Sequence, residues 1–86
     1  MDDAAPAYLE RKRADLSFYR TLLASGDLES IRLLAHKMKG TGTGYGFPAL
    51  TKLGGAIESA AVAGNRVELA AKIAEMARVL NAREPE

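Results

Sequence analysis

Three short breaks divide the 86-residue chain into four stretches in which apolar residues recur every three or four positions. The breaks are Ser25-Gly26, the glycine-rich run from Gly40 to Gly46, and Gly64-Asn65. Recurrence at three and four residues is typical of an amphipathic helix, and no stretch alternates convincingly like a half-buried strand. The chain is therefore predicted to be all-α, with helices over about 6–24, 27–43, 47–63 and 65–81.

The expected helix starts carry residues that suit these positions. Pro6 and Pro48 can stand in a first turn, where the N–H that proline lacks is not needed. Asp27 and Asn65 can cap the second and fourth helices through their side-chain oxygens. Because the connections are short, neighbouring helices should run antiparallel, which gives an up-down-up-down four-helix bundle. Residues 1–86 suffice for one small domain, with no linker that would divide them.

Composition argues against several classes of function. The chain has no cysteine and a single histidine, so thiol chemistry, disulfides and a histidine-based metal site are not expected. A net charge of +1 argues against a nucleic-acid binder, which needs a clustered basic face. No apolar run approaches the roughly 18 residues of a membrane span. The acidic start Met1-Asp2-Asp3 does not resemble a signal peptide, so a cytoplasmic location is expected.

The single histidine, His36, stands near the end of the second helical stretch, within His36-Lys37-Met38-Lys39-Gly40. A neutral imidazole is a nucleophile near pH 7. On a helix, Lys39 lies about one turn from the ring, and Gly40 removes a side chain that would crowd it. A nucleophile with a neighbouring cation and an open approach suits a phosphoryl group that arrives at a histidine and leaves from it.

The helical phase of the second stretch places His36 away from the core. At about 100° per residue, Ile31, Ala35 and Met38 share one direction, and His36 lies roughly 130° from it. The ring is therefore predicted to face solvent. An ordinary surface histidine on a charged helix is the competing interpretation, and the residues alone leave the two about equally supported.

Five residues flank the histidine in this projection. Arg32, Lys39 and Thr43 fall on one side of the ring, and Leu33 and Gly40 fall on the other. A partner that approaches the ring would meet this mixture of cations, bare backbone and an exposed leucine. Arg32, Leu33 and Thr43 are therefore predicted to contact the partner.

The motif and its spacing resemble those of the histidine-containing phosphotransfer (HPt) domain family: His36-x-x-Lys39-Gly40-Thr41, then Gly46, Leu50 and Ile57-Glu58. The motif covers about residues 28–58, and the four-helix pattern extends the resemblance to nearly the whole chain. The resemblance implies that His36 is the phosphoacceptor, that Lys39 steadies the phosphoryl oxygens, and that Gly40 leaves room for them. It also implies that Gly46 shapes the turn into the third helix.

The same resemblance implies the partners. Members of the family relay phosphoryl groups between aspartates of receiver domains, found in response regulators and hybrid histidine kinases, and they lack a nucleotide site. The chain is thus expected to be a phosphoryl carrier rather than an autonomous kinase, with no cofactor of its own and Mg²⁺ on the partner receiver. A monomer is expected because one chain supplies all four helices. The glycine-rich run departs from the family pattern and weakens the end of the second helix.

Other interpretations stay open at this stage. A helical adaptor that binds a partner without chemistry would survive the loss of His36. The dimerising phosphoacceptor hairpin of a sensor kinase usually has an acidic residue directly after the histidine, where this chain has Lys37. A nucleotide loop is disfavoured because Phe47 stands where G-x-G-x-x-G needs glycine. The charge run from Glu10 to Arg13 is predicted to be a solvated helix face, with an acidic partner as the alternative.

Overall fold

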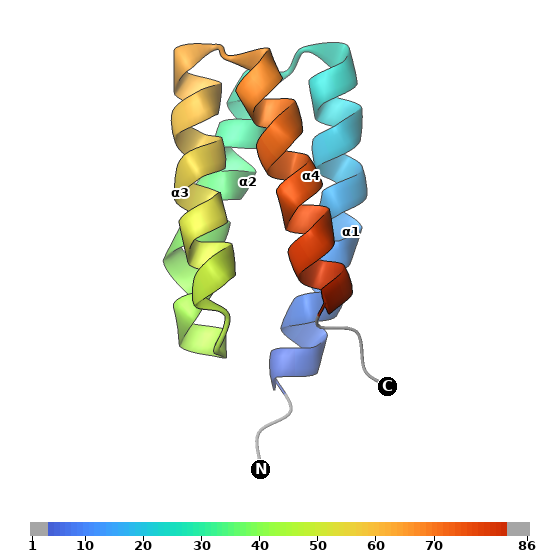
Figure 1. Ribbon diagram of the computed structural model, residues 1–86, viewed down its shortest axis with the longest axis vertical. Helices are drawn as coiled ribbons and strands as arrows, with labels where there is room; N and C mark the ends of the chain where they lie inside the picture. The colour runs from blue at the N-terminus through green and yellow to red at the C-terminus, as the bar shows by residue number, and fades with distance from the viewer. Residues whose placement is uncertain (1–3, 83–86) are drawn as a thin grey trace.

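The computed structural model describes residues 4–82. They form α1 (Ala4–Ser25), α2 (Leu28–Thr41), the short 3-10 helix η1 (Thr43–Tyr45), α3 (Pro48–Ala63) and α4 (Arg66–Ala82). In Figure 1 the chain runs up α1, down α2, up α3 and down α4, and the four helices lie side by side in one elongated bundle. The prediction of an all-α four-helix bundle is confirmed, and no strand occurs within residues 4–82.

The helix bounds agree with the predicted ranges to within two residues, and the expected caps form. The backbone N–H of Ser30 donates to Asp27 Oδ1 at 3.1 Å, at the start of α2. The backbone N–H of Glu68 likewise donates to Asn65 Oδ1 at 3.0 Å, at the start of α4. Each cap satisfies a backbone donor that the first helical turn leaves without a partner.

One local difference from the prediction is at the end of α2, which stops at Thr41 instead of continuing to residue 43. The N–H of Gly42 donates to Met38 O at 3.0 Å, and the chain then turns into η1. Gly46 follows with φ of 93°, a left-handed conformation that glycine adopts at no steric cost. The glycines therefore form the connection into α3, and the helical phase of α2 does not extend to Thr43.

Apolar side chains from all four helices fill one core. On α2, Ile31, Ala35 and Met38 are fully buried, as the helical phase predicted. The other helices and the turn before α3 contribute Tyr8, Tyr19, Phe47, Leu50, Leu53, Ile57, Ala60, Ala61, Leu69, Ile73, Met76 and Leu80. Because its buried stripe is fixed in this core, α2 turns its opposite side to solvent.

The N-terminal half of α1 corrects one prediction. Lys12 is only 8% exposed, so the charge run from Glu10 to Arg13 is not a fully solvated face. Its ammonium lies 5.1 Å from the centroid of the buried Tyr8 ring and 2.8 Å from Asp15 Oδ2. A cation over an aromatic face, with a carboxylate partner, offsets the loss of water around a lysine.

Tyr8 also ties α1 to the end of α2. Its ring stacks on Tyr45 of η1 with centroids 4.3 Å apart. Its hydroxyl lies 2.8 Å from Thr41 Oγ1, which in turn donates to the carbonyl of Lys37. The glycine-rich connection is therefore packed against α1 rather than left as a loose loop.

Candidate functional site

His36 projects from α2 with 62% of its side chain exposed, in agreement with the helical phase. Its Nδ1 lies 2.9 Å from Oε2 of Glu58 on α3. An ionised carboxylate only accepts hydrogen bonds, so Nδ1 carries the proton of the neutral ring. The free lone pair is then on Nε2, so Nε2 is the nitrogen of this ring that can act as a nucleophile.

Glu58 also binds the neighbouring lysine. Lys39 Nζ lies 3.0 Å from Glu58 Oε1, so one carboxylate bridges the ammonium and the imidazole. The hydrogen bond from Lys39, and next the one with His36, hold the pKa of the Glu58 carboxyl below its ordinary value. Glu58 is therefore an anion at neutral pH, and its negative charge stands beside Nδ1 of the ring.

Close packing of α2 on α3 brings these three side chains together. A Cβ at Gly54 would lie 2.5 Å from the backbone nitrogen of Lys39 and 2.8 Å from the carbonyl oxygen of Ala35. Real Cβ atoms do not approach backbone this closely, so only glycine fits there without moving the helices apart. Gly54 therefore sets the approach of α3 that lets Glu58 reach both His36 and Lys39.

The family of the chain follows from a match to a known family model. A family model described as the Hpt domain matches residues 3–83 of the 86-residue chain. The chain belongs to the Hpt family. Comparisons with curated proteins and with solved structures gave no match. Hpt domains carry out histidine phosphotransfer in phosphorelays and interact there with receiver domains and histidine kinases.

Glu58 is the residue of this Hpt domain that the sequence-based site prediction missed. It lies 22 positions after His36 and on a different helix, so the helical phase of α2 could not reveal it. The one available signal was its place in Ile57-Glu58 at the end of the family-like motif. Lys39 was predicted beside the ring, and the structure places its ammonium on Glu58.

Gly40 and Leu33 lie on the exposed side of α2, as predicted. A Cβ at Gly40 would meet nothing within 4 Å, so the packing of the Hpt domain itself does not require glycine there. Leu33 is 49% exposed and stands three residues before the histidine. Together they leave bare backbone and an apolar side chain on the helix that carries His36.

Arg32 and Thr43 are each engaged in a local interaction. Arg32 donates to both carboxylate oxygens of Glu29, at 3.0 and 2.6 Å. Thr43 lies in η1, where its N–H and hydroxyl are 2.7 and 2.9 Å from Thr51 Oγ1. The projection that placed Thr43 beside the histidine assumed that α2 extends to residue 43, whereas α2 ends at Thr41.

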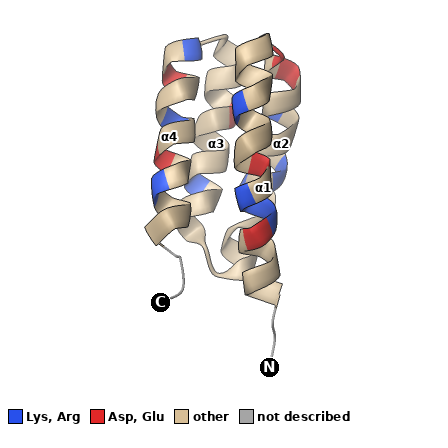
Figure 2. Ribbon diagram, turned by 90° about the vertical axis from the view of Figure 1, so that its right-hand side faces the viewer, with Lys and Arg blue, Asp and Glu red and all other residues tan. Residues whose placement is uncertain are grey.

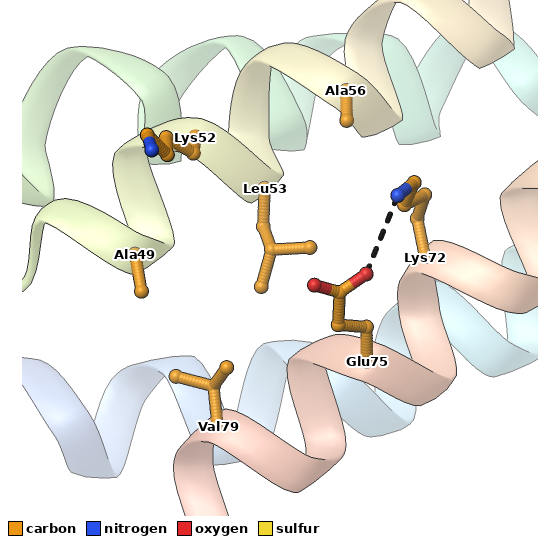
Figure 3. A pocket seen from close by; sticks show the side chains of 7 residues that line it. All are labelled: Ala49, Lys52, Leu53, Ala56, Lys72, Glu75 and Val79. Carbon is orange, nitrogen blue, oxygen red and sulfur yellow. Dashed lines mark hydrogen bonds and ion pairs between the residues drawn. The ribbon is translucent and has the colours of Figure 1, made fainter.

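Charged residues and one pocket occur elsewhere on the described part of the Hpt domain. Figure 2 shows basic and acidic residues interspersed along the helices in that view. Figure 3 shows a pocket between α3 and α4, with Lys72 bound to Glu75 at 3.3 Å. Its lining residues are Ala49, Lys52, Leu53, Ala56, Lys72, Glu75 and Val79, none of which belongs to the histidine site.

Two further classes of feature are absent from residues 4–82. No group of three or more histidine, cysteine, aspartate or glutamate side chains is placed to hold a metal ion there. None of the helices in that range combines the length and the apolar character that crossing a membrane requires.

Proposed function

We propose that His36 accepts a phosphoryl group on Nε2 from an aspartyl phosphate of a receiver domain and passes it to an aspartate of another receiver. The observation that carries this proposal is the 2.9 Å hydrogen bond between Nδ1 and Glu58 on a ring that is otherwise exposed. It keeps the proton on Nδ1 and leaves Nε2 as the nucleophile. The match to the Hpt family supports the class of reaction and of partner.

Neither of the two phosphoryl transfers requires a general base to remove a proton. In the first, the Nε2 lone pair forms the N–P bond while the P–O bond to the donor aspartate breaks and releases a carboxylate. Nδ1 keeps its proton, so the phosphorylated ring becomes cationic, and the anionic Glu58 stabilises that charge. In the second, the acceptor carboxylate attacks phosphorus, the N–P bond breaks and the neutral ring returns.

Lys39 and Gly40 are proposed to interact with the phosphoryl group: Lys39 by contacting its oxygens and Gly40 by leaving space for it. The side chain of Lys39 is 47% exposed and ends 3.0 Å from Glu58, the carboxylate that also binds the ring, so we expect its ammonium to contact phosphoryl oxygens when they arrive. Gly40 leaves the neighbouring surface open. Because phosphoryl transfer depends on positioning and on charge neutralisation, we expect the Mg²⁺ of the receiver to supply the remaining positive charge, and no cofactor in this chain.

The proposed docking surface surrounds the histidine on α2 and α3. Leu33 would supply an apolar contact on α2, with Arg32 at its rim and Thr43 as a polar contact. On α3, Val62 is 71% exposed and follows Glu58 by one helical turn, so it would add an apolar contact from the helix that carries Glu58. A receiver that approaches Nε2 would cover these side chains.

The test is a transfer assay with a receiver domain that carries a labelled aspartyl phosphate. The wild-type domain should take up the label as an acid-labile phosphate, and His36→Gln should take up none while it melts at the same temperature. If His36→Gln is labelled as well, the site is wrongly assigned. If the wild type binds the receiver without taking up label, the chain is an adaptor instead.

A further inference from the structure

Gly55 lies inside α3, three residues before Glu58, and its own helix gives no reason for a glycine. Glycine weakens a helix interior relative to alanine. For Gly54 the reason is the contact with the α2 backbone, where a Cβ would lie 2.5 Å from Lys39 N. For Gly55 the surroundings differ, because a Cβ there would meet only a flexible side chain from α2.

That side chain is Lys39. A Cβ at Gly55 would lie 3.4 Å from Cδ and 4.0 Å from Cγ of the lysine. The aliphatic stem thus crosses α3 over the bare backbone of Gly55, and the ammonium ends 3.0 Å from Glu58 Oε1. A methyl group at position 55 would make ordinary van der Waals contact with the stem, whereas a longer side chain would occupy its path.

Resting on the function proposed for His36, we propose that Gly55 is a positioning residue that keeps the Lys39 ammonium beside the histidine. The bare backbone supports the stem along its length, so the ammonium reaches Glu58 in the free domain. From there it can turn to phosphoryl oxygens on Nε2 without leaving the surface of α3. Without this path, the lysine would extend into solvent, as an exposed lysine on a helix ordinarily does.

The test compares three substitutions on α3. Gly55→Leu should displace the stem, whereas Gly55→Ala should keep it in place. Ser59→Leu is the matched control, because Ser59 is exposed one turn further along the same helix and receives the same added bulk. All three variants should melt at or above the wild-type temperature, since alanine and leucine favour helix over glycine or serine.

The first readout does not depend on phosphotransfer. An NMR titration of the Glu58 carboxyl should show its pKa raised in Gly55→Leu to the value found in Lys39→Ala, because both changes remove the ammonium. Gly55→Ala and Ser59→Leu should titrate like the wild type. An unchanged Glu58 titration in Gly55→Leu overturns the proposal, whether or not His36 accepts a phosphoryl group.

The second readout is the rate of label transfer from a phosphorylated receiver. Gly55→Leu should slow transfer by the same factor as Lys39→Ala, and the double variant Lys39→Ala/Gly55→Leu should be no slower than Lys39→Ala. If the two losses multiply, position 55 acts independently of the lysine and the proposal fails. An equal loss in Ser59→Leu would show that added bulk obstructs the partner, which also contradicts it.

Discussion

Oε2 of Glu58, on α3, lies 2.9 Å from Nδ1 of His36, on α2, and joins the two helices at the exposed ring. The other oxygen of the same carboxylate binds Lys39 at 3.0 Å. The carboxylate therefore selects the ring tautomer and binds the Lys39 ammonium at the same time. Changes at Glu58 should affect both the nucleophile and its positive neighbour.

Substitutions at Glu58 should separate hydrogen bonding from charge. Glu58→Gln keeps an oxygen that can accept from Nδ1 but loses the anion that stabilises the phosphorylated ring. We expect transfer to slow by about tenfold, less than the 10²–10³ typical of an enclosed electrostatic contact, because this ring is open to water. Glu58→Ala should be slower still and should show a mixture of ring tautomers by ¹⁵N NMR. Wild-type rate and tautomer in Glu58→Ala would remove Glu58 from the site.

Lys39 should contribute to transfer and hardly to folding. Lys39→Ala removes a half-exposed side chain, so the melting temperature should shift by less than about 4 °C. Transfer should slow, or the phosphohistidine should decay faster, because the cation for the phosphoryl oxygens is gone. Lys37→Ala is the matched control, since Lys37 is an exposed lysine one residue from the histidine on the same helix. Equal kinetics in the two variants would contradict the role of Lys39.

Leu33 and Ile31 should show opposite patterns, because one is exposed and the other fully buried on the same helix. Leu33→Asp should weaken receiver binding while the thermal melt stays close to that of the wild type. Ile31→Ala should lower the free energy of unfolding by roughly 2–5 kcal/mol, as truncation of a buried side chain does. Binding titrations and melts measure both effects. Unfolding of Leu33→Asp would mean that this leucine supports the core.

The ion pairs of Glu58 predict how stability depends on pH. Its folded-state pKa lies below the ordinary value of 4.5, so the stabilising contribution is complete above 4.5 and is lost as the pH falls through the lower folded-state value. Glu58→Gln should therefore lose less stability than the wild type between pH 5 and pH 3. Urea denaturation at a series of pH values measures the difference. Parallel losses in the two proteins would show that Glu58 contributes nothing.

Helical periodicity was sufficient to predict the fold and the orientation of α2, because each depends on residues that lie close together in the sequence. Ile31, Ala35 and Met38 determine which way α2 faces, so the exposure of His36 followed from spacing alone. Glu58 could not be found in this way, since its contact depends on how closely α3 packs on α2 at Gly54.

Two other differences have equally local causes. The end of α2 was predicted two residues too late because a helical projection carries no information about where the helix ends, and α2 stops at Thr41. Lys12 was expected in solvent because a lysine in a charge run usually lies there. Its burial depends on contacts with the ring of Tyr8 and the carboxylate of Asp15. The two contacts of Lys12 join a cation to an aromatic ring and to a carboxylate, which apolar periodicity does not register.

In the proposed mechanism, Nε2 of His36 carries the phosphoryl group while Nδ1 keeps its proton and donates it in a hydrogen bond to Glu58. The most direct measurement is a ¹⁵N and ³¹P NMR spectrum of the histidine-labelled domain after incubation with a phosphorylated receiver. Only one histidine is present, so a single ring contributes to the spectrum. We predict coupling between phosphorus and Nε2, with a protonated Nδ1. Phosphorus on Nδ1, or an unmodified ring in a domain that binds the receiver, would contradict the account.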